Sequence, residues 1–180
     1  MDDRLWVAGE LGVSPDDLAE VYVAWGPGLR RTAFLLCGDW QAAEDLVQSA
    51  FVKVFAARRR VRERVALPAY LRQTLIRTYV DSATRRWRGE IPTELADDAA
   101  DPGVHDPEDR LVMLGALARL PTRQRACLVL RFYEDCSVEE TAAALGCSPG
   151  TVKSTTARGL TRLRSSLADL RPTPALTKDM

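Results

Sequence analysis

The stretch SVEETAAALGCSPGTVKS, residues 137–154, decides the fold of the C-terminal part of the chain. Ser137, followed three positions later by Glu, forms a capping-box pattern that predicts the start of a short helix. Gly146 supplies the left-handed backbone that ends a helix in a tight turn. Ser148 and Pro149 predict the cap and the first residue of a second helix. Two capped helices joined by a short turn with glycine indicate a helix-turn-helix.

The second of these helices has two distinct faces. At 100° per residue, one face gathers residues that we expect to pack inward, namely Val152, Thr156, Leu160, Leu163, Leu167 and Leu170. Small polar and basic side chains occupy the remaining surface: Thr151, Lys153, Ser154, Arg158, Thr161 and Arg162. Short donors suit phosphates and base edges, and Arg suits guanine, so this surface is expected to contact DNA. An ordinary amphipathic surface helix is the alternative.

Two helices are predicted near the N-terminus. The first begins at Ser14-Pro15 and runs toward Leu36, with a break expected around Pro27. In the second, over residues 40–56, apolar positions recur at three and four and predict one buried stripe: Ala43, Leu46, Val47, Ala50, Phe51, Val54 and Phe55.

Three residues of the second helix lie off this stripe. They are Asp45, Gln48 and Val52, an acid, an amide and an aliphatic side chain. Such an exposed strip is able to dock a partner helix. Taken alone, the pattern favours a plain solvated face.

A third helix is predicted from Leu67 to about Trp87. Its apolar arc consists of Leu71, Leu75, Ile76, Tyr79, Val80 and Ala83, and its polar side carries Arg77, Asp81, Thr84, Arg85 and Arg88. Arginines beside Tyr70 and Trp87 suit a DNA backbone or unstacked single-stranded bases. Residues 58–64, rich in Arg, are expected to form a loop or a frayed helix end.

Charge alternates in blocks although the net charge is zero. Residues 21–90 hold thirteen Lys and Arg against six acids, and residues 111–171 hold nine against five. Residues 91–110 hold one Arg and seven acids, together with several prolines and no periodicity. The pattern predicts two domains that each contact phosphate, joined by an acidic linker. With no alternating strand pattern, the fold class is expected to be all-α.

The composition offers little catalytic chemistry. The four cysteines, at 37, 127, 136 and 147, lack the paired spacing of a zinc site and are expected to be buried free thiols. His105 is the only histidine, and the acids cluster in the proline-broken linker. We therefore expect no metal, no cofactor and no enzymatic activity. Without a basic, apolar leader or an 18-residue apolar run, the chain is expected in the cytoplasm.

Two segments resemble a known family. AEDLVQSAF, residues 43–51, resembles region 2.2 of bacterial sigma factors. LPTRQR at 120–125, RFY at 131–133 and residues 137–164 resemble their region 4. The short chain, which passes directly from one region to the other, resembles the extracytoplasmic-function (ECF) sigma factors.

The resemblance implies a domain plan. Residues 10–89 would form the region 2 helical bundle, 90–108 the acidic flexible linker, 109–171 the region 4 helix-turn-helix domain and 172–180 a disordered tail. Core RNA polymerase and promoter DNA would be the partners, with an anti-sigma factor as a further candidate.

The resemblance also implies roles for residues. Asp45, Gln48 and Val52 would bind the clamp helices of the polymerase β′ subunit, and the β flap would be a second contact. The minus-ten promoter element would be recognised and opened by Tyr70, Arg77, Thr84, Arg85, Trp87 and Arg88. The helix from Pro149 would read the minus-thirty-five element. ECF factors often carry Asn where this chain has Arg77, which leaves the capture of a flipped minus-ten base open.

A stand-alone helix-turn-helix regulator with an N-terminal interaction domain is the alternative function. It explains the C-terminal helices equally well but not a second basic helical domain that contains residues 43–51. For the sigma-like protein, an unstructured acidic linker predicts poorly aligned domains and weak, salt-sensitive DNA binding by the free chain.

Overall fold

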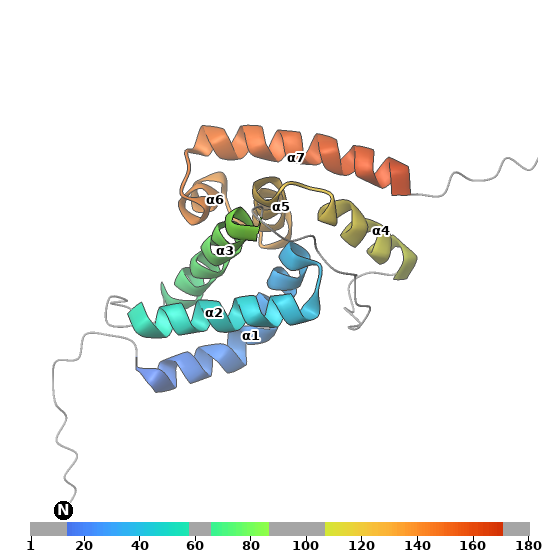
Figure 1. Cartoon of the computed structure of the whole chain (residues 1–180). Helices are drawn as coiled ribbons and strands as arrows, with labels where there is room; N and C mark the ends of the chain where they lie inside the picture. The colour runs from blue at the N-terminus through green and yellow to red at the C-terminus, as the bar shows by residue number, and fades with distance from the viewer. Residues whose placement is uncertain (1–13, 58–65, 87–106, 171–180) are drawn as a thin grey trace, which may run out of the picture.

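The computed structural model describes residues 14–57, 66–86 and 107–170, and the regular structure in these ranges is helical (Figure 1). The elements in order are α1 (Pro15–Cys37), α2 (Trp40–Ala57), α3 (Leu67–Arg86), α4 (Pro107–Ala118), α5 (Thr122–Leu128), the π-helix η3 (Val129–Tyr133), α6 (Val138–Leu145) and α7 (Pro149–Leu170). The predicted all-α class is confirmed. Among the described helices, none has both the length and the apolar character needed to span a bilayer.

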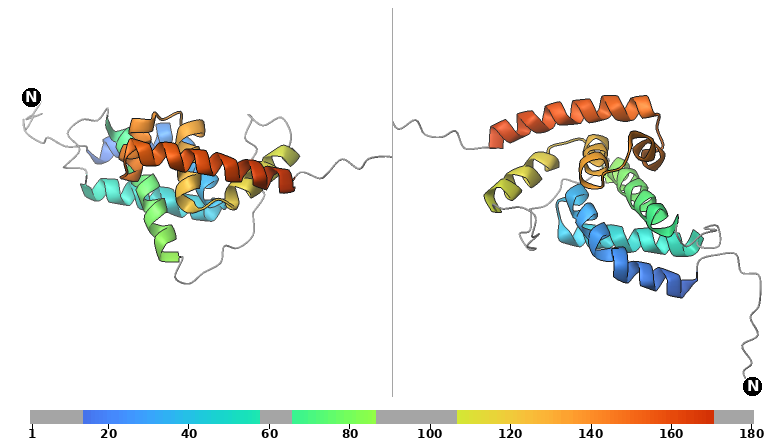
Figure 2. Two further views of the ribbon diagram at one scale, coloured as in Figure 1. Left: turned by 90° about the horizontal axis from the view of Figure 1, so that it is seen from above. Right: turned by 180° about the vertical axis from the view of Figure 1, so that it is seen from behind.

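Helix α1 starts and ends at the predicted signals. Ser14 Oγ accepts from the Asp17 backbone N–H at 3.1 Å, and the Asp17 carboxylate accepts from the Ser14 N–H at 2.9 Å. Gly38, at φ 77°, ends the helix in the left-handed region. The break expected around Pro27 was wrong, because α1 is a single helix with this proline inside it. The ribbon changes direction part-way along α1 (Figure 2), as expected where a proline removes a backbone donor.

Helices α1, α2 and α3 pack together around an apolar interior. The α2 stripe is confirmed at its five buried members Ala43, Leu46, Val47, Ala50 and Val54. Phe51 is half-buried, whereas Phe55 is 45% exposed, so its expected burial was wrong. At 100° per residue, Phe55 points about 120° away from the centre of the buried stripe. In α3 the side chains of Leu71, Leu75 and Ile76 are fully buried, as predicted.

The helix-turn-helix is confirmed at each predicted signal. Ser137 Oγ accepts from the Glu140 N–H at 3.1 Å, and the Glu140 carboxylate accepts from the Ser137 N–H at 2.7 Å. Gly146 has φ 62°, in the left-handed region that a side chain disfavours. Ser148 Oγ accepts from the Thr151 N–H at 3.2 Å at the start of α7. Helices α4, α5 and α6 all pack against α7.

The N-terminal and C-terminal helices form one body. A single apolar cluster includes Ala33, Val47 and Leu71 from α1, α2 and α3, and Ala126 and Leu130 from α5 and η3. Helix α3 lies beside α6 (Figure 1), and α1 also contacts α4, α5 and η3. The expectation of poorly aligned halves was therefore wrong for this structure. Local sequence patterns carry no signal for apolar contacts between segments that lie more than fifty residues apart.

Candidate nucleic-acid and polymerase interfaces

The outer face of α7 is an exposed polar and basic surface. All six residues predicted to contact the minus-thirty-five element are exposed: Thr151, Lys153, Ser154, Arg158, Thr161 and Arg162. The small hydroxyls bond to their own helix, since Ser154 Oγ donates to the Thr151 carbonyl at 3.1 Å and Thr161 Oγ1 donates to the Ala157 carbonyl at 3.1 Å. The cationic heads remain at the surface, where they are placed to meet phosphates or base edges.

Arg158 lies in the first half of α7. Its Nε donates to the Ser154 carbonyl at 3.3 Å, so the side chain runs back along the helix toward the N-terminus. The direction is the usual one for a long side chain on a helix, which leans over the preceding turn. The guanidinium is thereby carried toward the end of α7 that follows the helix-turn-helix turn.

The inner side of α7 fixes how this face is presented. Val152 is fully buried, and Thr156, Leu160, Leu163, Leu167 and Leu170 are half-buried as predicted. Gly159 and Ser166 are also buried, which was not predicted from the sequence. A Cβ built on Gly159 would lie 3.3 Å from Leu128 Cγ of α5. The spacing of 159 and 166 from Val152, seven and fourteen residues, was the available signal.

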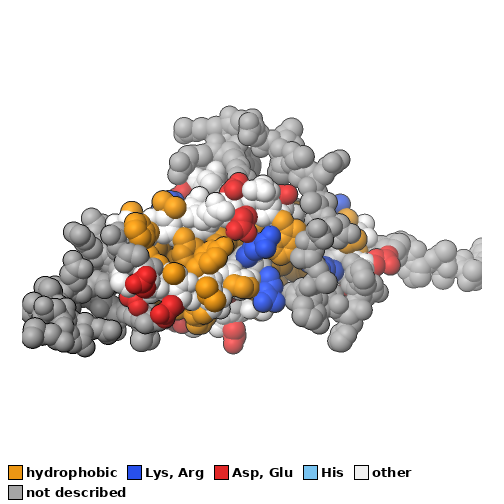
Figure 3. All heavy atoms as spheres, turned by 90° about the horizontal axis from the view of Figure 1, so that it is seen from below, with side chains coloured by type: hydrophobic (Ala, Val, Ile, Leu, Met, Phe, Trp, Pro, Cys, Tyr) orange, Lys and Arg blue, Asp and Glu red, His pale blue; other side chains and the backbone are white. Residues whose placement is uncertain are grey.

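On α2, the predicted partner strip is exposed. Asp45, Gln48 and Val52 lie opposite the buried stripe, and Val52 is 68% exposed. Gln41 Nε2 donates to Asp45 Oδ1 at 3.3 Å. Figure 3 shows hydrophobic side chains gathered with Lys, Arg, Asp and Glu side chains on the face over α1 and α2. An acid, an amide and an exposed aliphatic group along one helix face suit a partner helix whose surface is partly polar and partly apolar.

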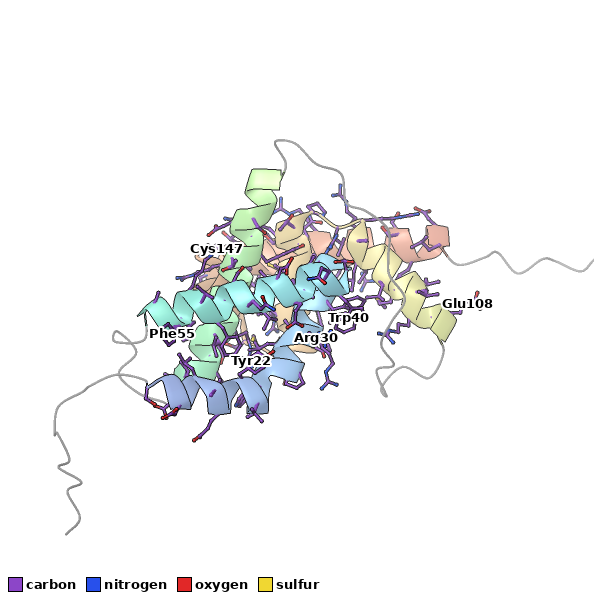
Figure 4. The ribbon with its side chains drawn as sticks, turned by 60° about the horizontal axis from the view of Figure 1, so that its bottom comes forward. Tyr22, Arg30, Trp40, Phe55, Glu108 and Cys147 are labelled. Carbon is purple, nitrogen blue, oxygen red and sulfur yellow. The ribbon has the colours of Figure 1, made fainter. Side chains whose placement is uncertain are left out.

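A groove between α1 and α2 adjoins this surface. It has a volume of about 310 Å³ and is lined by Tyr22, Val23, Gly26, Pro27, Arg30, Glu44 and Val47. Arg30 Nε lies 3.0 Å from Glu44 Oε2, and the Arg30 guanidinium lies 5.1 Å from the centre of the Trp40 ring. The Tyr22 and Phe51 rings meet edge to face, with 5.2 Å between the ring centroids. Figure 4 shows Phe55, Tyr22, Arg30 and Trp40 along this side of the helix pair. The groove was not predicted, because it depends on how α1 crosses α2.

The residues predicted for the minus-ten element are only partly described. Tyr70 is half-buried and packs against the core. Arg77 is exposed, but its guanidinium reaches α6: Nη2 donates to the Ala143 carbonyl at 3.1 Å and Nε to the Ala144 carbonyl at 3.4 Å. Thr84 and Arg85 belong to the end of α3.

The other predictions in this part of the chain lie outside the described residues. They are Trp87, Arg88 and the Arg-rich segment 58–64. The acidic linker, apart from its last residues, and the tail also lie outside them.

Burial suppresses the chemistry of two of the four cysteines. None of the four cysteines, which all lie in the described ranges, is in a disulfide; Cys127 and Cys136 are buried, and Cys37 and Cys147 are half-buried. Burial raises the pKa of the Cys127 thiol to about 11, and burial also raises the pKa of Cys136. Both thiols are therefore protonated at neutral pH and are poor nucleophiles and metal ligands. Within the described part of the chain, no three His, Cys, Asp or Glu side chains are grouped to hold a metal ion.

Comparison with known proteins identifies both halves. The Sigma-70 region 2 family model matches residues 21–89, and the Sigma-70 region 4 model matches residues 110–163. The RNA polymerase sigma-E factor of Streptomyces avermitilis is 41% identical over 140 residues, which cover 77% of this chain and 78% of that protein. The chain belongs to the ECF sigma factors. This family is not a class of enzymes.

Further relatives support the assignment of this chain to the ECF sigma factors. The ECF RNA polymerase sigma factor EcfG of Rhodopseudomonas palustris is 32% identical over 158 residues, covering 84% of this chain and 86% of that protein. The sigma factor RpoE of Bartonella quintana, crystallised in complex with the anti-sigma factor NepR, superposes with a TM-score of 0.71 at 29% identity. That match covers 87% of this chain and 99% of the other.

Proposed function

We propose that this sigma factor binds core RNA polymerase through α2, directs it to promoters through two DNA-reading surfaces, and helps to melt the DNA. One observation carries the proposal: a single chain presents a helix-turn-helix face on α7 and a separate exposed strip of Asp45, Gln48 and Val52 on α2. A stand-alone regulator accounts for the first surface alone. It does not account for the second surface or for the match to region 2.

For the minus-thirty-five element we assign the outer face of α7. The supporting observations are the exposed cations Lys153, Arg158 and Arg162 and the tight packing that holds the helix from behind. A recognition helix enters the major groove with its N-terminal residues against base edges. Arg158 is the best placed to donate to a guanine.

For polymerase we assign the α2 strip to the clamp helices of the β′ subunit. The strip is polar at Asp45 and Gln48 and aliphatic at Val52, and the α1–α2 groove extends the apolar area beside it. Such a mixed surface suits a partner helix better than it suits nucleic acid, because phosphates are repelled by Asp45. The β flap is assigned as a second polymerase contact, and an anti-sigma factor as a further partner.

For the minus-ten element we assign α3 and the segment that follows it. The proposed contacts are Tyr70, Arg77, Thr84, Arg85, Trp87 and Arg88, which combine cations with aromatic rings. We also assign the domain plan. Residues 10–89 form the first domain, 90–108 the linker, 109–171 the second domain and 172–180 a tail. Since polymerase and promoters lie in the cytoplasm, we assign the protein to that compartment.

Reconstituted transcription tests the proposal. The purified chain is added to core RNA polymerase that lacks any other sigma factor, with a library of genomic promoters as template. We expect initiation from a subset of promoters, with permanganate-reactive unpaired thymines in the minus-ten region. Tight binding of a DNA site by the chain alone, with no transcription from any template, would instead support the stand-alone regulator.

A further inference from the structure

The N-terminal half of α1 carries an exposed apolar patch. Val23 is 79% exposed, and Tyr22 and Trp25 beside it are each 47% exposed. All four residues from 22 to 25 are apolar and exposed, although they lie inside a helix that packs against α2. Phe55 of α2, which is 45% exposed, lies on the same side of the helix pair (Figure 4). A clustered patch of this kind indicates a surface that contacts another molecule.

Charged side chains stand at both ends of this patch. Asp16, Val23 and Arg30 are all exposed and are spaced by seven residues, so successive members are about 20° apart around the helix. Val23 and Arg30 also line the groove between α1 and α2, together with Tyr22 and Pro27. Figure 3 shows the same order on this face, where hydrophobic side chains lie between acidic side chains at the left and basic side chains to the right.

The order of acid, apolar group and base is complementary to itself when it is reversed. If a second copy lies across the first with its α1 antiparallel and the two Val23 side chains at the two-fold axis, Asp16 of each copy faces Arg30 of the other. A parallel arrangement would place acid against acid and base against base. The charges therefore favour the antiparallel pair, in which the same surface of both copies is used.

The contact that Arg30 makes inside its own chain leaves room for this second ion pair. Its Nε lies 3.0 Å from Glu44 Oε2, and its side chain is 52% exposed. A guanidinium carries five N–H donors, so donation through Nε leaves the others able to meet a second carboxylate. Glu44 thus holds Arg30 at the rim of the groove, where a second copy can reach it.

We propose that this face of α1 is a self-association surface on which a second copy of the chain binds antiparallel about a two-fold axis. Val23 packs against Val23 at the axis, the groove side chains Tyr22 and Pro27 surround it, and an ion pair between Asp16 and Arg30 closes each end. The surface draws on one helix and the edge of another, so the buried area is at the low end for protein interfaces. The dimer is therefore reversible and dissociates on dilution.

This dimer differs from the DNA-reading dimer of a helix-turn-helix regulator. Such a regulator places its two recognition helices side by side, one helical turn of DNA apart. Here α7 and the N-terminal half of α1 lie on opposite sides of the molecule (Figures 1 and 2). Pairing through α1 thus turns the two α7 faces away from each other. The proposal uses no assignment of polymerase or promoter contacts.

Sedimentation velocity of the full chain over a dilution series tests the proposal. We expect the sedimentation coefficient of wild type to rise from that of a monomer toward that of a dimer as concentration increases. Val23→Arg places two like charges at the axis and should weaken association by at least about tenfold. Leu111→Arg makes the same kind of change at a 48% exposed aliphatic side chain of α4 and should associate as wild type does.

Exchange of the end charges tests the antiparallel arrangement. Asp16→Arg and Arg30→Glu each place like charges together at both ends, so each variant alone should associate about tenfold more weakly at low salt. An equimolar mixture of the two restores an ion pair at both ends and should recover most of the association. High salt should narrow all of these differences, because exposed charges are screened.

Folding is monitored in every variant by far-UV circular dichroism and melting. Arg30→Glu also loses the contact with Glu44, a partly exposed pair whose loss costs little stability. If that variant fails to fold, Val23→Arg and Asp16→Arg still decide the question, because both positions are exposed.

Three results would overturn the proposal. The first is a wild-type chain that stays monomeric at every concentration, which would leave the face to a different protein. The second is a dimer that Val23→Arg does not weaken. The third is a mixture of the two charge variants that associates no better than either alone. None of these measurements includes polymerase or DNA, so their outcome is independent of the reconstituted transcription that tests the proposed function.

Discussion

Gly159 of α7 lies so close to Leu128 of α5 that a Cβ at position 159 would sit 3.3 Å from Leu128 Cγ. The Cβ would also lie 3.5 Å from Gln124 Cβ. The absence of a side chain at Gly159 thus sets how closely the recognition helix approaches its support. The glycine has an ordinary helical backbone here, so its role is close approach and not an unusual backbone angle.

We expect Gly159→Val to destabilise the protein by about 1–3 kcal/mol, because the branched side chain would force α5 and α7 apart. For a chain of this size, the melting temperature should fall by roughly 2–4 °C per kcal/mol. Gly150→Val is the matched control, since Gly150 is exposed in the first turn of α7 with its nearest Cβ contact at 3.9 Å. Equal melting temperatures for the two variants would contradict the close-approach role.

The reciprocal cap of α6 predicts a pH-dependent contribution to stability. The pKa of Glu140 is lowered because its carboxylate accepts from the backbone N–H and the hydroxyl of Ser137. Because this pKa is lower in the folded than in the unfolded state, the ionised carboxylate stabilises the folded state at pH values above the ordinary pKa of 4.5. This stabilisation is lost as the pH falls through the lowered pKa. Wild type and Glu140→Gln should therefore differ in melting temperature at pH 7 and converge at acidic pH.

Ser137→Ala removes the other half of the cap and should cost about 1 kcal/mol at pH 7. Ser165→Ala, an exposed position inside α7, is the matched control and should have little effect. A difference between wild type and Glu140→Gln that persists unchanged at acidic pH would show that the Glu140 charge is not involved.

Local signals in the sequence were sufficient to predict most of the helices and where they begin and end. The caps at Ser14, Ser137 and Ser148 and the glycine stop at Gly146 were predicted, because each uses side chains within a few residues of the helix end. The faces of α2 and α7 followed in the same way from helical periodicity. The exposed polar faces of these helices were therefore predictable from the sequence alone.

Contacts between distant segments were not predictable in this way. The break expected at Pro27 was wrong because packing of α1 on its neighbours keeps one helix through the proline. Glu134 gave no sequence signal of its partners Thr32 and Arg72, which lie 102 and 62 residues earlier in the chain. Arg77 was read as a DNA contact from its helix alone, and only the fold brings α6 to it. These tertiary contacts are part of what holds the N-terminal and C-terminal helices together.

Arg158→Ala should weaken recognition of the minus-thirty-five element at one base position. A bidentate contact to a guanine is worth about 1–3 kcal/mol, and its loss should relax preference at that position only. Arg164→Ala is the matched control, because Arg164 is exposed on α7 about 120° around the helix from Arg158. Transcription by the reconstituted holoenzyme across a promoter library gives the measurement. If both variants lose activity equally at all promoters, Arg158 contributes only general attraction to phosphate.

Asp45→Arg should abolish capture of core polymerase while leaving the fold intact. The side chain is exposed and opposite the buried stripe of α2, so the melting temperature should shift little. A reversed charge in a docking surface turns an attraction into a repulsion, which typically costs several kcal/mol of binding. Gln48→Ala removes an amide three residues along the same strip and should weaken capture to a smaller degree. Loss of capture with unchanged melting would separate docking from folding.

The same charge reversal at Asp169 is the matched control for this prediction. Asp169 is exposed near the end of α7, and its contact with Arg119 is long, at 3.8 Å. A pull-down of core enzyme by tagged variants gives the comparison, with helix content and melting recorded for each protein. We expect Asp169→Arg to capture polymerase as wild type does. Capture by Asp45→Arg at the wild-type level would place the polymerase contact elsewhere, because no docking surface centred on Asp45 tolerates a change of two charges.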